Sequence, residues 1–227
     1  MTRGFFITGT DTGVGKTLVS CLLLEFFNAQ GLHTAAMKPV ASGCRNSSLG
    51  WRNDDAEQLQ QAASIDLSYE QVNPYALPAA IAPHLAAHQC NMAISIEAIL
   101  ENFRHIYDTS QLVIVEGVGG WFVPLNETQT TADLARRLKL PVIVVVGIRL
   151  GCINHALLTI KAIQQDRENP PIAGWVANII DPETAATDEV IESLQAYIKA
   201  PLLGTIPHLK NTKARGDWLH LGLIDVI

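Results

Sequence analysis

Charged side chains are scarce in this chain, and no part of the sequence concentrates positive charge. Only 17% of its 227 residues are Asp, Glu, Lys or Arg, and the formal net charge is −6. Proteins that bind nucleic acid through its phosphate backbone carry basic patches or stripes. The sequence therefore predicts no nucleic-acid partner as a main role.

Cysteine pairs and long apolar runs are also missing. The chain has four widely spaced cysteines and no CxxC pair: Cys21, Cys44, Cys90 and Cys152. This spacing argues against a zinc site or a disulfide framework and favours reduced thiols. The longest apolar run, 140–148, is too short to span a bilayer. The first expected strand begins at residue 4, which leaves no room for a signal peptide. We expect a cytoplasmic protein with no membrane partner.

Apolar strand and helix patterns, by contrast, alternate along the whole chain. Several of the strand patterns are continuous apolar runs, which are typical of strands buried on both faces of a parallel sheet. The expected strands cover 4–8, 34–37, 112–115, 142–146, 172–177 and 202–206. Helical spacing covers 18–27, 96–107, 153–163 and 190–198. This order predicts an α/β fold with a doubly wound, mostly parallel sheet, in a single domain over residues 1–227.

Two segments interrupt this alternation. Residues 41–53 are rich in Ser, Gly and Asn, and residues 72–82 carry Pro74 and Pro78. We expect both segments to be loops outside the regular elements. Loops at the carboxyl ends of strands build the sites of open α/β sheets, so both are candidate site segments.

The most informative motif is the sequence GTDTGVGKT at residues 9–17, between an apolar strand and an apolar helix. In a phosphate-binding P-loop, backbone N–H groups and the helix N-terminus surround the phosphates. Lys16 would then reach the outer phosphates, and the Thr17 hydroxyl would hold Mg²⁺. The strict pattern requires glycine where Thr10 stands, so the loop is a variant. An ordinary tight turn is the alternative, but it would need neither Lys16 nor Thr17.

Three further polar positions lie at or just after the ends of expected strands. Glu116 ends a buried strand and precedes glycines, which is where P-loop enzymes place a carboxylate on the Mg²⁺ side. Lys38 follows the second strand, where it could neutralise charge developing on a phosphate, and Ser42 could donate a hydrogen bond nearby. The alternative for Glu116 and Lys38 is a solvated charge at a strand end.

The pair Asp54 and Asp55 opens an expected helix after Asn53. One aspartate is enough to cap that helix, and the other could ligate Mg²⁺. Spacing alone leaves both roles open for Asp55. His84 and His88 lie four residues apart on one helix face. We interpret them as ordinary helix residues, because the glutamate of an HExxH metal site is absent.

Several segments resemble, in order and over almost the whole chain, the dethiobiotin synthetase family. The matching segments are 9–17 (GTDTGVGKT), 38–43 (KPVASG), 53–56 (NDDA), 115–121 (VEGVGGW), 150–156 (LGCINHA), 174–178 (GWVAN) and 201–207 (PLLGTIP). The resemblance implies a P-loop NTPase fold and a ligase of biotin synthesis. Its reaction joins CO₂ to 7,8-diaminononanoate and closes a ureido ring, with ATP as co-substrate and Mg²⁺ as cofactor. It also implies a homodimer.

The resemblance implies a role for each matching residue. Lys38 and Lys16 are the implied catalytic residues. The implied ATP-binding residues are Gly13, Val14, Gly15, Lys16, Thr17, Leu18, Asp55, Glu116, Gly117, Val118, Gly119, Asn178, Pro207, His208 and Leu209, with Asn178 reading the adenine. Thr17, Asp55 and Glu116 would hold Mg²⁺. The implied substrate-binding residues are Thr12, Ser42, Gly151, Cys152 and Asn154, the last three reaching into the site of the neighbouring subunit.

Three positions depart from the resemblance: Gly13, Ala82 and Val190 replace a glutamate, a serine and a tyrosine of some relatives.

Two other classes of protein compete with this interpretation. Switch ATPases dimerise around ATP with a lysine early in the loop, where this chain has Asp11. Amidotransferase-type ligases need an added glutaminase domain, for which 227 residues leave no space.

Overall fold

A six-stranded parallel sheet forms the centre of the computed structural model, which describes residues 4–209 and 218–220. Its strands are β1 (Gly4–Gly9), β2 (Thr34–Met37), β7 (Leu112–Glu116), β8 (Val142–Ile148), β9 (Ile172–Ile179) and β10 (Leu202–Ile206). Their order is β10-β9-β8-β1-β7-β2, and every neighbouring pair is parallel. The predicted doubly wound α/β fold is confirmed.

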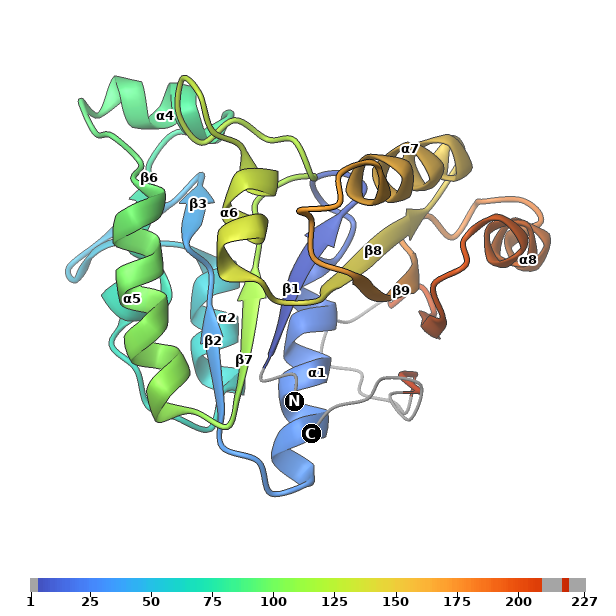
Figure 1. The fold of residues 1–227 in the computed structure, drawn as a ribbon, viewed down its shortest axis with the longest axis horizontal. Coiled ribbons are helices and arrows are strands. Elements are labelled where there is room, and N and C mark those ends of the chain that lie inside the picture. The colour runs from blue at the N-terminus through green and yellow to red at the C-terminus, as the bar shows by residue number, and fades with distance from the viewer. Residues whose placement is uncertain (1–3, 210–217, 221–227) are drawn as a thin grey trace.

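Helices cover both faces of this sheet (Figure 1). Side chains on a strand alternate between faces, so Phe5 and Ile7 pack with α1, whereas Phe6 lies in the core on the opposite face. The larger helices are α1 (Lys16–Ala29), α2 (Asp54–Ala62), α5 (Ile96–Thr109), α6 (Thr131–Leu138), α7 (Cys152–Gln165) and α8 (Thr187–Tyr197); α3 (Tyr69–Val72) and α4 (Pro83–Gln89) are short. In the described part of the chain, no helix is both long and apolar enough to cross a membrane.

The direction of winding reverses at β1. From β1 the chain passes to β2 at the sheet edge, returns to β7 beside β1, and then continues to β8 on the other side of β1. Ligands of open α/β sheets bind at such a switch point, outside the carboxyl ends of the strands. The GTDTGVGKT loop follows β1 directly, so the fold places it at this point.

The two segments expected to be loops contain strands, so that expectation was wrong. β3 (Val40–Ser42) pairs in parallel with β6 (Tyr75–Leu77), and β4 (Arg45–Ser47) forms an antiparallel hairpin with β5 (Gly50–Arg52). Strands of three residues are too short to show a hydrophobic period, and the partner of β3 lies far along the sequence. This pairing fixes the segment that follows Lys38.

Candidate active site

A cavity of about 680 Å³ lies at the carboxyl ends of β1, β2 and β7. It brings together most of the predicted phosphate, metal and substrate residues: Thr12, Gly13, Gly15, Lys16, Thr17, Leu18, Lys38, Ser42, Asp55, Glu116, Val118 and Gly119. Its wall also includes Asn53, Ala80, Ile81 and Ala82 from the two candidate site segments, and three residues that the sequence reasoning missed: Gln58, Pro83 and Val123. Pro83 is the first residue of α4, and a proline at that position is a recognisable sign of a helix start.

The phosphate loop depends on glycine at its last turn. Gly15 is the N-cap of α1 and has φ 91°, a left-handed conformation that glycine adopts readily. A Cβ atom built on Gly15 would lie 2.1 Å from Nδ2 of Asn178. That Nδ2 atom donates a 2.8 Å hydrogen bond to the carbonyl oxygen of Val14. Asn178 therefore braces the loop from β9, a contact that the sequence reasoning did not predict.

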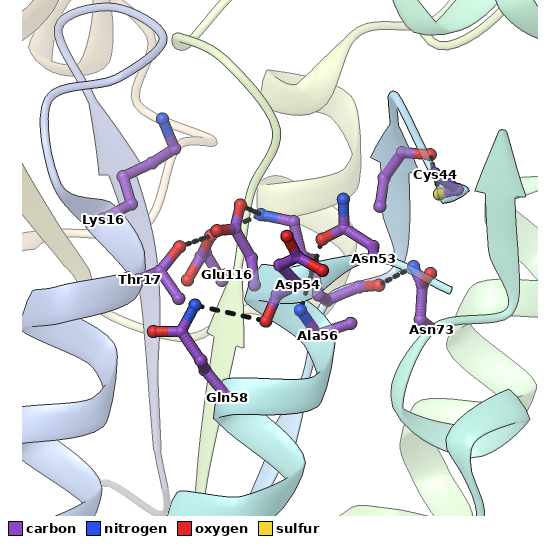
Figure 2. A network of polar contacts seen from close by, with 12 residues as sticks. Lys16, Thr17, Cys44, Asn53, Asp54, Ala56, Gln58, Asn73 and Glu116 are labelled. Carbon is purple, nitrogen blue, oxygen red and sulfur yellow. Dashed lines mark hydrogen bonds and ion pairs between the residues drawn. The ribbon is translucent and has the colours of Figure 1, made fainter. Parts of the chain in front are cut away.

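Lys16 lies buried against the loop that precedes it. Its Nζ atom donates a hydrogen bond of 3.0 Å to the carbonyl oxygen of Asp11, and Figure 2 shows its side chain extending away from Glu116. Burial lowers the pKa of Lys16 to about 8, against the opposing effect of Glu116. A phosphate oxygen entering the loop would offer this amine a charged acceptor in place of a neutral one.

An ion pair joins the phosphate loop to the end of β8. Nη2 of Arg149 lies 2.6 Å from Oδ2 of Asp11, and the other carboxylate oxygen of Asp11 accepts from the Thr12 N–H at 2.7 Å. Arg149 thus balances a carboxylate that would otherwise repel a phosphate. The sequence reasoning missed Arg149, because it lies 138 positions from Asp11 and outside the motif that contains Asp11.

Lys38 and Glu116 form a buried pair, so neither is a solvated strand-end charge. Lys38 is 4% exposed and Glu116 is 0% exposed. Nζ of Lys38 lies 2.5 Å from Oε1 of Glu116 and 3.1 Å from Oδ2 of Asp55. The hydroxyl of Thr17 donates to the same Oε1 atom at 3.0 Å (Figure 2). The partners of Lys38 therefore come from β7 and α2.

The charge state of Lys38 follows from this pairing. Burial by itself would lower the pKa of Lys38, but the Glu116 and Asp55 carboxylates outweigh burial and hold the pKa above its ordinary value. The amine therefore keeps its proton at neutral pH. The cavity contains a permanent cation between two carboxylates.

Two buried oxygen atoms in the cavity have no hydrogen-bond partner among the residues that the structure describes. They are Oε2 of Glu116 and Oγ of Ser42. Buried polar atoms without partners are costly, and at a site they are commonly completed by a ligand. Oε2 of Glu116, the Asp55 carboxylate and the Thr17 hydroxyl are the hard oxygen donors that Mg²⁺ prefers. These donors fit Mg²⁺, which would take its remaining ligands from water and the phosphates of the nucleotide.

A dedicated transition-metal centre is not formed by the described residues. They contain no group of three or more His, Cys, Asp and Glu residues that could hold a metal ion. His84 is half-buried and His88 is exposed, both on α4. That these are ordinary helix residues stays a prediction.

The structure shows which residue caps α2, one of the two roles that spacing left open for Asp55. The cap of α2 is Asn53, whose side-chain oxygen accepts from the Ala56 N–H at 3.2 Å. Asp54 points outward and pairs with Arg45 at 2.8 Å. The idea that an aspartate caps this helix was therefore wrong. Asp55 serves no cap and lines the cavity instead.

The remaining predicted residues lie outside this cavity. Gly117 is buried behind it and donates its N–H to Ile7, while Pro207, His208 and Leu209 follow β10. Gly151, Cys152 and Asn154 lie at the start of α7. Cys152 is buried in its own chain. The structure does not bring these residues into the cavity of their own chain.

This chain is similar in sequence to known proteins over almost its whole length. A family model described as an AAA domain matches residues 3–215. The chain is 48% identical over 225 residues to a protein of Cellvibrio japonicus named ATP-dependent dethiobiotin synthetase, covering 99% of this chain and 98% of the relative. It is 47% identical to a Pseudomonas aeruginosa protein of the same name, covering 96% of each.

Two solved structures share the fold at low identity. The septum site-determining protein of Pyrococcus horikoshii, complexed with Mg-ADP, has a TM-score of 0.55 at 18% identity, covering 92% of this chain and 82% of the other. A ParA family ATPase of Chlorobium tepidum has a TM-score of 0.53 at 17% identity, covering 92% and 85%. At such identities the likeness concerns the fold alone. The relatives at 47–48% identity match almost the full length of this chain, so the chain belongs to the family of ATP-dependent dethiobiotin synthetases.

Proposed function

We propose that this chain uses ATP to join CO₂ to 7,8-diaminononanoate and to close the ureido ring of dethiobiotin, a step of biotin synthesis. The observation that carries the proposal is the buried Lys38–Glu116 pair beside the phosphate loop, with Asp55 at its open side. A permanent cation at that position suits a reaction in which every step moves negative charge. We place the enzyme in the cytoplasm, where ATP is available.

The reaction has three steps, and this chain supplies an electrostatic partner for each. One amine of the substrate adds to CO₂ and loses a proton, which gives a carbamate. A carbamate oxygen attacks the γ-phosphorus, and ADP leaves. The second amine attacks the carbamate carbon, loses a proton and expels phosphate. Lys38 stabilises the carbamate and the transferring phosphoryl group, Lys16 holds the outer phosphates, and Ser42 and Thr12 orient the substrate.

Mg²⁺ would be held by Thr17, Asp55 and Glu116, and it would neutralise charge on the phosphates of ATP. In the cavity the two carboxylates balance Lys16 and Lys38, so bare ATP would meet little net positive charge. The nucleotide is therefore expected to enter with its metal. At the other end of the nucleotide, Asn178, Pro207, His208 and Leu209 lie where β9 and β10 end, and we assign the adenine to that side.

The proposed reaction is tested by product formation with each component left out in turn. Purified protein with ATP, Mg²⁺, labelled bicarbonate as the CO₂ source and 7,8-diaminononanoate should release ADP and phosphate in equal amounts and place the label in dethiobiotin. A switch ATPase would hydrolyse ATP without the diamine, and an amidotransferase would need glutamine. Either of those two results would contradict the proposal.

Asp55 is expected to act through the metal. Asp55→Asn keeps the shape of the side chain but removes a charged oxygen donor, so the Mg²⁺ concentration for half-maximal activity should rise at least about tenfold. Asp54→Asn is the matched control, because Asp54 is the adjacent carboxylate, pairs with Arg45 and lies outside the cavity wall. A magnesium titration of both variants gives the answer. Equal curves for Asp55→Asn and the parent would show that Asp55 does not bind the metal.

We also propose that the enzyme works as a homodimer. Gly151, Cys152 and Asn154 lie outside their own cavity, at an α7 N-terminus that can bind a carboxylate through backbone N–H groups. Leu150 beside them is 98% exposed, and Leu158 is also exposed. A second copy that covers these side chains could place this helix end against the carboxylate of the substrate in the neighbouring site.

Mixed dimers test this arrangement. Lys38→Leu should inactivate the subunit that holds the phosphates, and Asn154→Asp should repel the substrate carboxylate in the neighbouring site. Subunit exchange between the two inactive variants would make one intact site in each heterodimer, so about a quarter of the parental activity should return. No recovery, despite heterodimers seen by mass spectrometry, would show that each site takes both residues from the same subunit.

A further inference from the structure

A buried chain of hydrogen bonds runs behind the cavity from α2 to the end of β2. The N–H of Asn53 donates to the hydroxyl of Tyr69 at 2.7 Å, and this hydroxyl donates to Oδ1 of Asn73 at 3.0 Å. Nδ2 of Asn73 then donates to the carbonyl oxygen of Lys38 at 2.6 Å. Figure 2 labels Asn53 and Asn73, and a dashed line there marks the hydrogen bond that Asn73 donates. One continuous chain therefore links the backbones of Asn53 and Lys38.

The direction of every bond in this chain is determined. A backbone N–H can only donate, so the Tyr69 oxygen accepts from Asn53 and has its own proton for Asn73. A carbonyl can only accept, so the amide nitrogen of Asn73 must face Lys38. Tyr69 is 6% exposed and Asn73 is 2% exposed, so water does not compete for these bonds. Burial raises the pKa of Tyr69, and its hydroxyl keeps the proton that the chain requires.

Each end of this chain meets the cavity. Lys38 carries the buried ammonium group, while Asn53 caps α2 two residues before Asp55. Oδ2 of Asp55 lies 3.1 Å from Nζ of Lys38, although its side chain is 45% exposed. A half-exposed carboxylate of this kind does not hold its own position well, since exposed ion pairs contribute little. The start of α2 must be fixed by other contacts.

The Tyr69 ring is also held from its outer side. The guanidinium of Arg52 lies 4.0 Å from the ring centroid, and it pairs with Glu70 at 3.3 Å. Arg52 ends β5, directly before Asn53. The segment that enters α2 therefore contacts Tyr69 twice, through the Arg52 guanidinium and through the Asn53 N–H.

We propose that Tyr69 and Asn73 are positioning residues for Asp55, because they tie the start of α2 to the backbone of Lys38. This inference rests on the proposed role of Asp55 at the metal and phosphates. It assigns a task to two residues that do not line the cavity. Without these hydrogen bonds, α2 would keep its fold, but the distance between the Asp55 carboxylate and the Lys38 amine would no longer be fixed. Misplacement by a fraction of an ångström is enough to slow a reaction that depends on alignment.

Tyr69→Phe tests the proposal, because it removes one hydroxyl and keeps the ring beneath Arg52. We expect kcat to fall about tenfold and the Mg²⁺ concentration for half-maximal activity to rise about fivefold, with KM for the diamine little changed. Tyr75→Phe is the matched control: the Tyr75 hydroxyl also accepts from a helix cap, the Ser95 N–H at 3.1 Å, but it serves α5 outside the cavity wall. Both variants should lose about 2–4 °C of thermal stability, and only Tyr69→Phe should alter the magnesium titration.

A double-mutant cycle separates positioning from a general loss of structure. In an Asp55→Asn background, Tyr69→Phe should lower kcat by less than about twofold, because the group that it positions is already gone. An undiminished tenfold effect in that background, or equal magnesium titrations for Tyr69→Phe and Tyr75→Phe, would overturn the inference. If Asp55→Asn alone left the magnesium titration unchanged, the proposed role of Asp55 would fail instead, so the two failures are distinguishable.

Discussion

Replacing Lys38 with leucine is expected to lower kcat about 10²–10³-fold, the cost of removing one fixed charge-stabilising donor from a site of developing negative charge. The loss should fall on kcat rather than on nucleotide affinity, because Lys16 and the loop backbone still hold the phosphates. The measurement is single-turnover kinetics with CO₂ and 7,8-diaminononanoate, beside calorimetry of nucleotide binding. Nucleotide affinity should stay within about tenfold of the parent.

The same change affects stability, since Glu116 is 0% exposed and has Lys38 as its cationic partner at 2.5 Å. Removing one member of a buried ion pair typically costs about 3–5 kcal/mol, because the other charge remains buried and unpaired. The double variant Lys38→Leu/Glu116→Gln removes both charges and should recover much of this stability in urea unfolding while remaining inactive. Parental kcat in a folded Lys38→Leu protein would contradict the proposed mechanism.

Lys16→Gln is expected to have an effect of similar size, about 10²–10³-fold on kcat, together with weaker nucleotide binding. Glutamine keeps a donor near the Asp11 carbonyl oxygen but carries no charge toward the outer phosphates. Steady-state kinetics at saturating ATP and calorimetry with an ATP analogue measure the two effects separately. Unchanged turnover in this variant would remove Lys16 from the phosphate site.

The pH dependence of nucleotide binding provides an independent check on Lys16. Burial lowers its pKa to about 8, so the amine of the free protein is charged below about pH 8 and loses its charge above it. Nucleotide affinity should therefore be greatest below about pH 8 and should fall by up to about tenfold for each pH unit above it. The Lys16→Gln protein should lack this decrease. A parental affinity that stays constant to pH 10 would contradict the assignment.

The sequence was a good guide to the central sheet, because its strands are buried on both faces. A strand such as β8 is continuously apolar, and that pattern is visible without knowledge of its neighbours. The sequence was a poor guide to β3 and β6, because each is three residues long and its pairing partner lies far along the chain. Helix α6 also escaped prediction, since its eight residues give only a brief periodic signal.

The chain by itself determined the phosphate loop, because the glycines, Lys16 and Thr17 of such a loop are local in sequence. It also predicted, through the resemblance of their segments, that Lys38, Asp55 and Glu116 take part in the reaction. Only the tertiary structure decided that these three side chains meet, that Asn53 rather than an aspartate caps α2, and that Arg149 balances Asp11. The physical reason is that ion pairs and hydrogen bonds between distant segments depend on which strand ends the sheet places side by side, and no local pattern encodes that neighbourhood.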